Sequence, residues 1–358
     1  MVAVHQFLAS LAPRDAQSQH HLHIRDALRG AGYASDLYVG EAKGEFRAQA
    51  QPFRAYCGAP GDWLLYGHAI GTPVAEFVVS RPEPMILDYH NVTPAAMFEA
   101  WEPSSAIRMA AGRRQLAPLA ARCRLGLADS AFNETELRGL GARRTAVVPI
   151  MIDTKNFATA PAAKVLDALS DSRSRGARHL LFVGRLAPNK RQHELVAALA
   201  ALRTGFDIDA RLHLVGASAS DRYRRTLIRF IEALGLGRAV TLVGSAAPAD
   251  LAAYYEGCDA FVSASAHEGF LVPLLEAWHH RLPVVASPAA AVGETMGDAG
   301  VRVRRPTPIA VAAAAARVLG DDALRAELVA RGLGRLDDFA LDRSRERLLD
   351  AVASVVAP

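Results

Sequence analysis

The sequence predicts an α/β protein made of two doubly wound parallel-sheet domains. Its 358 residues are more than one hydrophobic core usually organises. Short apolar and β-branched runs alternate with helical patterns, which is typical of parallel sheets covered by helices on both faces. The alternation stops after Pro149 and restarts at His179. We therefore expect a first domain at 1–150, a linker region at 151–178, a second domain at 179–334 and a C-terminal helix within 335–358 that crosses back to the first domain.

Each half contains a series of candidate strands. In the first half we expect a helix over 19–31 and strands at 2–8, 34–39, 63–66, 85–88, 125–128 and 145–148. In the second half we expect strands at 179–183, 211–215, 239–243, 260–262, 283–286 and 301–303. Ligands of open parallel sheets bind beyond the carboxyl ends of the strands. The loops that follow these strands are therefore the places to look for functional residues.

The composition is that of an ordinary globular protein, with 51% apolar and 22% charged residues. The net charge of +4 does not require a nucleic-acid partner. The three cysteines form no CxxC or zinc-ligand spacing, which favours a reducing compartment. The N-terminus reads as a strand rather than a signal peptide, and no run of about 18 apolar residues is present. We expect a cytoplasmic protein, with the inner face of the membrane as an alternative location.

Two carboxylates bracket one loop in the second half. Glu268 and Glu276 lie eight residues apart, between a β-branched run and an apolar helical pattern that begins at Pro273. The first falls in the loop and the second about a turn into the helix, so they are staggered along one pocket. Carboxylates accept hydrogen bonds from sugar hydroxyls, and the backbone N–H groups of Gly269, Phe270, Leu271 and Val272 would suit a phosphate. The alternative is a solvated loop glutamate followed by an ordinary helical one.

A second loop carries two cations. Gly184 directly follows a predicted strand. Arg185 and Lys190 come after this glycine and before the next predicted helix. The glycine lets the backbone approach a ligand. Arginine can grip phosphate oxygens with two parallel hydrogen bonds, and lysine adds a mobile charge. The alternative is a solvated basic loop. The sequence lacks GxxxxGK[ST], GxGxxG, HExxH, DFG and GxSxG motifs, which argues against other common nucleotide and hydrolase sites.

Together these loops resemble the donor site of retaining glycosyltransferases of glycosyltransferase family 4 (glycosyl transferases group 1), which have the GT-B fold and include mannosyltransferases and sucrose synthases. The family patterns are Gly-Arg-x-x-x-x-Lys and two glutamates separated by seven residues. The resemblance implies two Rossmann-like domains facing a cleft. It places Arg185 and Lys190 on the donor diphosphate, Glu268 near the transferred sugar and Glu276 on the ribose hydroxyls. Leu271 stands where the family has a second glycine.

The same resemblance suggests further contacts. Gly244 would lie beside the nucleobase, and in the first domain His90 would contact the donor sugar, with a capping or core histidine as the alternative. His68 stands in a His-x-x-Gly loop and Ser18 where the family has a glycine pair. Asn133 would contact acceptor or sugar, while Ser130 would cap the following helix.

Three histidines, His20, His21 and His23, could suggest a metal, but a surface helix face is the stronger interpretation. We therefore predict no metal and no cofactor, with a nucleotide-diphosphate sugar as co-substrate.

The predicted function is a retaining, metal-independent transfer of a sugar to a glycan, lipid-linked or small-molecule acceptor, as in polysaccharide or glycoconjugate biosynthesis. A GT-B-fold nucleotide-sugar epimerase and a non-catalytic nucleotide-sugar-binding protein are the alternatives. Arginines along 97–124 leave open a peripheral membrane contact, with a solvated face as the other interpretation.

Overall fold

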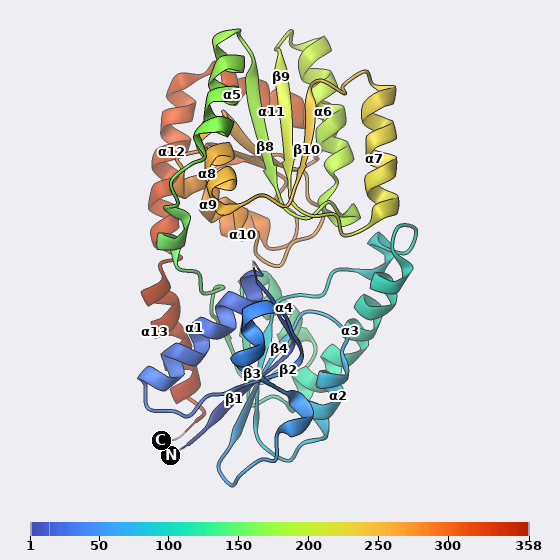
Figure 1. The fold of residues 1–358 in the computed structure, drawn as a ribbon. Helices are drawn as coiled ribbons and strands as arrows, with labels where there is room; N and C mark the ends of the chain where they lie inside the picture. The colour runs from blue at the N-terminus through green and yellow to red at the C-terminus, as the bar shows by residue number, and fades with distance from the viewer. Residues whose placement is uncertain (1, 14, 357–358) are drawn as a thin grey trace. The chain divides into compact units, whose positions relative to one another are not determined.

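The computed structural model describes residues 2–13 and 15–356, and the chain divides into two compact units. The first unit is built from the N-terminal segment up to Glu99, from Pro103–Ile152 and from a C-terminal return that begins at Phe339. The second unit is built from Ala100–Glu102 and Asp153–Asp338. Each unit contains its own sheet, as Figure 1 shows.

Within the described residues, the first unit has a seven-stranded parallel sheet in the order β3-β2-β1-β4-β5-β6-β7. Its strands are β1 (Val4–Leu11), β2 (Leu37–Ala42), β3 (Ala50–Pro52), β4 (Trp63–His68), β5 (Met85–Tyr89), β6 (Leu125–Ala128) and β7 (Thr145–Val147). From β1 the chain adds β2 and β3 on one side, and then β4 on the other. The strand order therefore reverses between β1 and β4, which is the switch point of this sheet.

Helices cover both faces of this sheet. They are α1 (Ala16–Gly30), α2 (Pro73–Ser80), α3 (Pro103–Arg122), α4 (Ala131–Gly139) and α13 (Leu341–Ala353), with 3-10 turns at Gly44–Ala48, Phe53–Ala55 and Ala95–Met97. Helices α1 and α13 contact each other and share a core with Leu65 and Ile86. The neighbouring strand residues Tyr66 and Leu87 point to the opposite face, where α2 and α3 pack.

The second unit has a six-stranded parallel sheet, within the described residues, in the order β10-β9-β8-β11-β12-β13. Its strands are β8 (Arg178–Val183), β9 (Ala210–Val215), β10 (Val240–Gly244), β11 (Ala260–Ser263), β12 (Val284–Ala286) and β13 (Val301–Arg302). Strands β8 and β11 are neighbours, with Leu181 opposite Phe261. The order reverses between them, so the loops after β8 and β11 flank the switch point of the second sheet.

The helices of the second unit are α5 (Ala163–Ser174), α6 (Gln192–Gly205), α7 (Asp221–Ala233), α8 (Pro248–Gly257), α9 (Pro273–His279), α10 (Val292–Met296), α11 (Pro308–Gly320) and α12 (Asp322–Asp337), with 3-10 turns η4 (Thr154–Phe157) and η5 (Pro188–Lys190). Helices α6 and α11 pack together over a core that includes Phe182 and Leu214. On the same two strands, His179 of β8 and His213 of β9 face the other side of the sheet, where α5 and α8 contact each other.

The predicted fold class of two α/β units with parallel sheets is confirmed. The prediction missed β3, a three-residue edge strand that ends in a proline, because so short a segment gives no alternating pattern. The C-terminal helix expected within 335–358 does not begin at 335, since α12 continues to Asp337 and α13 begins at Leu341. No helix among the described residues is long and apolar enough to cross a bilayer.

The predicted linker region, 151–178, differs from the observed structure. Residues Ala163–Ser174 form α5, and Leu166 and Leu169 lie against Gly257 of α8. The polar run that begins at Ser170 is the last part of this helix and its exit. The two apolar residues, three positions apart, give α5 the buried stripe that the polar composition concealed.

Candidate active site

The two motif loops of the second unit are joined at the switch point of its sheet. The loop after β8 and the loop after β11 are connected through the backbone, because the Ala266 N–H donates to the Asn189 oxygen at 2.8 Å. The Asn189 side-chain amide donates in return to the His267 oxygen at 3.3 Å. Residues 78 positions apart in the sequence are thereby held together where a ligand of a parallel sheet is expected to bind.

Lys190 and Glu268 form an ion pair across these loops, from Nζ to Oε2. The lysine side chain is 17% exposed and the glutamate 7%, so solvent screens this pair only weakly. The second oxygen of Glu268, Oε1, is buried and has no hydrogen-bond partner within the described residues. Since a carboxylate accepts through both oxygens, Glu268 retains capacity for a ligand hydroxyl.

Arg185 lies at the start of the same loop, with an exposed side chain. Its carbonyl oxygen accepts from the side-chain amide of Gln192 at 2.9 Å, which fixes the loop backbone. No ion pair or hydrogen bond engages its guanidinium in the part of the chain that the structure describes. The site therefore has one lysine that is already paired and one arginine available for an anion.

Three glycines line the strand ends beside this site. Gly184, Gly216 and Gly244 follow or end the neighbouring strands β8, β9 and β10, and the Gly216 N–H donates to the Gly244 oxygen at 2.8 Å. Gly216 has φ +141°, and a Cβ there would lie 2.2 Å from the Gly184 oxygen. Only glycine fits this close approach of two backbones. Gly184 and Gly244 also have positive φ, +150° and +75°.

The predicted phosphate-binding segment, 269–272, connects Glu268 to α9. The side chains of Phe270 and Leu271 are buried, at 5% and 6% exposure, so only their backbones can meet a ligand. Leu271 has φ +77°, a left-handed conformation that costs a residue with a side chain about 1–2 kcal/mol. Glycine adopts this conformation without that cost, which explains why the family motif has a glycine at this position. Here the burial of the leucine side chain offsets part of the strain.

Glu276 lies in α9 and lines a small cavity together with Asn156, Phe157 and Tyr255. The Tyr255 hydroxyl donates to Glu276 Oε2 at 2.5 Å. Burial raises the pKa of Glu276, and the bond from Tyr255 opposes that shift. No bond joins Glu276 to Arg185 or Lys190 among the described residues, so the second glutamate has surroundings of its own.

In the first unit, His90 belongs to a buried polar cluster just beyond β5. Its Nδ1 lies 3.0 Å from an Asp129 oxygen, and its Nε2 lies 3.4 Å from Asp88 Oδ2 and from His21 Nε2. Burial alone would lower the pKa of His90, but Asp129 and Asp88 outweigh it and hold the pKa well above its usual value. Both ring nitrogens face protein groups, so a hydrogen bond from His90 to a sugar would have to replace one of these contacts.

The expectation that His20 and His21 lie on a surface helix face is wrong. Their residues are 1% and 0% exposed, because α1 turns this side toward the sheet. His20 Nε2 lies 3.0 Å from Asp88 Oδ2, and His21 Nε2 would lie 2.4 Å from a Cβ at Gly67. Burial lowers the pKa of His21 well below its ordinary value, with Asp88 opposing the shift. Gly67 was the sequence signal for this burial. It lies in a strand, and its lack of a side chain leaves room for the His21 ring.

Three further predicted residues have internal partners. The Ser18 hydroxyl donates to Asp15 at 2.7 Å and accepts from the Ala12 N–H at 2.9 Å. His68 lies 3.0 Å from the Gly112 oxygen through Nε2, and burial lowers its pKa to about 4. The Asn133 side-chain oxygen accepts from the Asn91 side-chain amide at 2.8 Å. The predicted N-cap at Ser130 is confirmed, since its hydroxyl accepts from the Asn133 N–H. These side chains stabilise the loops in which a ligand role was expected.

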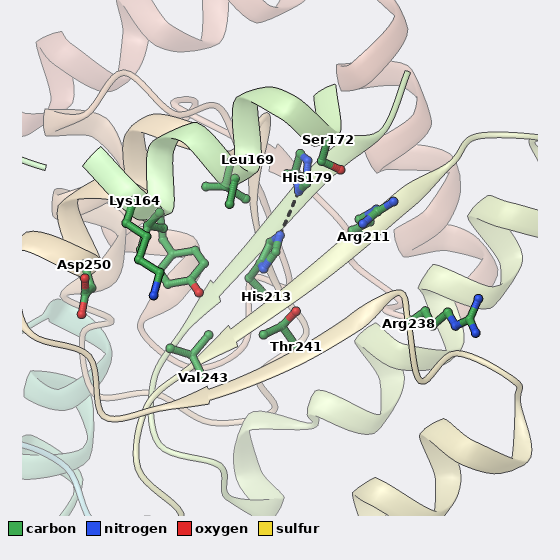
Figure 2. A pocket seen from close by; sticks show the side chains of 13 residues that line it. Lys164, Leu169, Ser172, His179, Arg211, His213, Arg238, Thr241, Val243 and Asp250 are labelled. Atoms are coloured by element: carbon green, nitrogen blue, oxygen red, sulfur yellow. Dashed lines mark hydrogen bonds between the residues drawn. The ribbon is translucent and has the colours of Figure 1, made fainter. Parts of the chain in front are cut away.

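A separate cavity of about 510 Å³ lies on the α5 side of the second sheet. Figure 2 shows His179 and His213 side by side in its wall, with their ring nitrogens 2.9 Å apart. Lys164, Arg211 and Arg238 also line it. None of the predicted site residues does, so this cavity is distinct from the loops that follow β8 and β11.

The sequence interpretation missed Asn189 and Gly216. Asn189 lies inside the Arg185–Lys190 segment, but only the structure shows that its amide joins the two loops. Gly216 directly follows β9, and a lone glycine after a strand was the available signal.

Comparison with known proteins agrees with this architecture. A family model described as "Glycosyl transferases group 1" matches residues 177–321. A D-inositol 3-phosphate glycosyltransferase of Kineococcus radiotolerans is 29% identical over 296 residues, which cover 76% of this chain and 66% of that protein. One from Salinispora tropica is 35% identical over 184 residues, 49% of this chain and 38% of that protein. The matched regions thus span less than two thirds of these relatives.

Solved structures resemble the whole chain. Sucrose-phosphate synthase from Thermosynechococcus elongatus has a TM-score of 0.78 at 19% identity, with 100% of both chains covered. HepE from Anabaena, in complex with UDP-glucose, has a TM-score of 0.75 at 17% identity and covers 98% of this chain and 100% of its own. Residues 177–321 of this chain therefore match the glycosyl transferases group 1 model, within a protein of two parallel-sheet α/β units that has the GT-B fold.

Proposed function

We propose that this protein is a retaining glycosyltransferase that moves a sugar from a nucleotide-diphosphate sugar to an acceptor without a catalytic metal. The observation that carries the proposal is the Lys190–Glu268 pair at the switch point of the second sheet, with the available guanidinium of Arg185 in the same loop. The family match over 177–321 covers this pair. Cations next to a buried carboxylate, beside a rim of glycines, suit a ligand with both phosphates and hydroxyls.

The two cations have a chemical task in this reaction. As the bond between the anomeric carbon and the phosphate oxygen breaks, negative charge grows on the departing diphosphate. Fixed cations stabilise that developing charge more than they stabilise the intact donor, and this difference lowers the barrier. Arg185 would grip two phosphate oxygens, and Lys190, oriented by Glu268, would supply the second charge.

The two glutamates would accept hydrogen bonds from hydroxyl groups of the donor. Glu268 Oε1 has no partner in the described part of the chain and would accept from the transferred sugar. Glu276 would accept from the ribose, in exchange for or in addition to its bond from Tyr255. Backbone groups of 269–272 and of the glycines at the strand ends would approach the phosphates and base, because no side chain intervenes at the glycines.

Retention favours a front-face route. A double displacement needs two carboxylates about 5 Å apart, on either side of the reacting carbon. Glu268 is paired with Lys190 and Glu276 is bonded to Tyr255, so neither is arranged as a nucleophile. In the front-face route, the anomeric carbon–phosphate bond breaks, the bond to the acceptor oxygen forms on the same face, and the acceptor proton passes to the departing phosphate oxygen. Arg185 and Lys190 provide the positive charge that a metal supplies in other enzymes.

The relatives suggest which substrates to try first. HepE has been solved with UDP-glucose and UDP, so a UDP-sugar is the first donor probe. The curated relatives are named D-inositol 3-phosphate glycosyltransferases, and another match is an O-antigen chain mannosyltransferase of Escherichia coli, 35% identical over 103 residues, or 28% of this chain and 27% of that protein. Inositol phosphate, glycan and lipid-linked acceptors therefore form the acceptor panel.

The proposal also includes a peripheral contact between the protein and a membrane surface. On α3, Ile107 is 69% exposed and Arg108 beside it is also exposed, a pairing that suits an anionic lipid surface. Co-sedimentation with anionic and neutral vesicles, with Ile107→Ser as the comparison, tests this contact. Equal sedimentation of the two proteins with anionic vesicles would exclude it.

The activity is tested by incubating the protein with a panel of nucleotide sugars, with and without acceptors. We expect nucleoside diphosphate to be released only when an acceptor is present, and the new glycoside to keep the anomeric configuration of the donor, measured by NMR. An epimeric nucleotide sugar formed from donor alone would instead identify an epimerase. A protein that binds the donor tightly but does not consume it with any acceptor of the panel would be a non-catalytic binding protein.

A further inference from the structure

The buried cluster of the first unit has the geometry of a metal centre. Three atoms converge in it: His21 Nε2, Asp88 Oδ2 and His90 Nε2. The carboxylate oxygen lies 3.8 Å from His21 Nε2 and 3.4 Å from His90 Nε2, and the two nitrogens are 3.4 Å apart. We propose that these three atoms bind a divalent zinc ion. The site lies wholly within the first unit and does not depend on the proposed transfer reaction.

The hydrogen bonds around the cluster leave the correct lone pairs for a metal. His21 Nδ1 lies 2.8 Å from the Gln6 side-chain oxygen, which can only accept, so the proton of this ring is on Nδ1. His90 Nδ1 lies 3.0 Å from an Asp129 oxygen and donates to it in the same way. In both rings Nε2 is then the nitrogen that can bind a metal, and on His90 the ion would displace the second ring proton that Asp129 and Asp88 favour. A ligating histidine that donates its other N–H to a carboxylate or carbonyl oxygen is the usual outer-shell arrangement of zinc sites.

His20 supports the site without being a ligand. His20, Asp88, His90 and Asp129 all offer ligand atoms within 4.8 Å of one another, so His20 is the alternative third or fourth ligand. However, the Met151 N–H donates to His20 Nδ1 at 2.8 Å, which places the ring proton on Nε2. That N–H donates to Asp88 Oδ2 at 3.0 Å. The oxygen keeps a second lone pair for the metal, and His20 orients it.

The spacing selects the kind of metal. An ion in tetrahedral geometry lies slightly out of the plane of the three atoms, about 2.2 Å from each at these separations, which is close to the length of zinc–nitrogen and zinc–oxygen bonds. Ligand atoms of a tetrahedral site with such bonds are about 3.3 Å apart, whereas neighbouring ligands of an octahedral magnesium site are about 3 Å apart. Separations of 3.4–3.8 Å therefore fit the tetrahedral geometry better. Imidazole ligands also favour zinc over magnesium or calcium.

The surroundings provide space and exclude solvent. His21, Asp88 and His90 are 0%, 1% and 7% exposed, so two imidazoles and a carboxylate converge in a nearly dry location. Gly67 of β4 makes room for the His21 ring, because a Cβ there would lie 2.4 Å from His21 Nε2. The fourth position would be taken by water or by a ligand of the protein. A bound ion would join α1 to the loop after β5.

The test measures metal binding by the full chain after removal of any affinity tag. Protein dialysed against Zn²⁺ and then against metal-free buffer should retain one zinc per chain by atomic emission. Replacement with Co²⁺ should give the intense visible absorption of a tetrahedral site. Zn²⁺ should raise the melting temperature of the wild type and leave that of His21→Gln unchanged.

Variants separate ligands, supporting groups and bystanders. His21→Gln and Asp88→Asn should lose the stoichiometric zinc, and Asp129→Asn should weaken zinc affinity by about 10- to 100-fold as an outer-shell change. His23→Gln, on the same helix outside the cluster, is the matched control and should bind as the wild type does. Circular dichroism checks that each variant folds. Wild-type protein that retains no zinc, a Co²⁺ spectrum of octahedral form, or unaltered zinc binding by His21→Gln would each overturn the proposal, and the first two need no variant.

Discussion

Lys190 and Glu268 form an ion pair that joins the loop after β8 to the loop after β11. The pair is mostly shielded from solvent, and Glu268 keeps one buried oxygen without a partner in the described residues. Removing either partner would leave the other as an unpaired, largely buried charge, which is costly. The pair therefore orients the lysine before a ligand arrives, and a bound diphosphate would share a cation whose position is already fixed. This geometry is the basis of the functional proposal.

Glu276→Gln should weaken nucleotide binding by roughly 10- to 150-fold, because a hydrogen bond to a charged carboxylate contributes about 1.5–3 kcal/mol. Calorimetric titration with UDP measures the effect. Tyr255→Phe is the matched control, since it removes the 2.5 Å bond to Glu276 but keeps the carboxylate, and it should weaken binding less. Unaltered UDP affinity in Glu276→Gln would contradict the assignment to ribose.

Gly216→Ala should lower the free energy of unfolding of the second unit by about 1–3 kcal/mol or more through backbone strain alone. The added Cβ would also lie 2.2 Å from the Gly184 oxygen, at φ +141°. Gly237→Ala is the control, because no atom lies within 4 Å of a Cβ there and its φ is not positive. Denaturant unfolding of both variants makes the comparison. Equal stabilities would show that the glycine rim is not constrained as described.

Stability should decline as the pH falls below about 6.5. Burial first, then His179 and Arg211, lowers the pKa of His213 to about 3, so the folded protein keeps this ring neutral where the unfolded chain protonates it. The unfolded state then binds more protons, and the free energy of unfolding falls by up to about 1.4 kcal/mol per pH unit for this histidine between pH 6.5 and 4. Urea unfolding across this range should show a shallower decline for His213→Gln. Parallel curves for variant and wild type would refute the effect.

Apart from the short edge strand β3, the sequence was sufficient for the strands of both sheets, and it grouped the two motif loops of the second unit. Parallel strands are continuous apolar runs that end at glycine or polar residues, and these runs located β8 and β11 within one or two residues. The loops that follow neighbouring strands must meet, so Arg185, Lys190 and Glu268 could be grouped from their places in the sequence alone. The ion pair between the last two adds detail that spacing alone does not contain.

The polar interior of the first unit could not be predicted in this way. Histidines at 20 and 21 read as a surface helix face because their partners, Gln6 and Asp88, lie on strands far away in the sequence. Ser18 was expected near a ligand, but Asp15 three residues earlier caps the helix and takes its hydroxyl. Local patterns identify which side of a helix is apolar, whereas buried polar partners depend on which strands the fold makes neighbours.

The most direct test of the proposed site is the turnover of Lys190→Ala with the nucleotide sugar and acceptor that the wild type uses. We expect a loss of about 10- to 150-fold, mainly in kcat, because a charged hydrogen bond of about 1.5–3 kcal/mol to the departing diphosphate is removed. Lys164→Ala, on α5 of the same unit, controls for the loss of one positive charge and should retain wild-type turnover. A folded Lys190→Ala protein with wild-type kcat would contradict the placement of the diphosphate between these two loops.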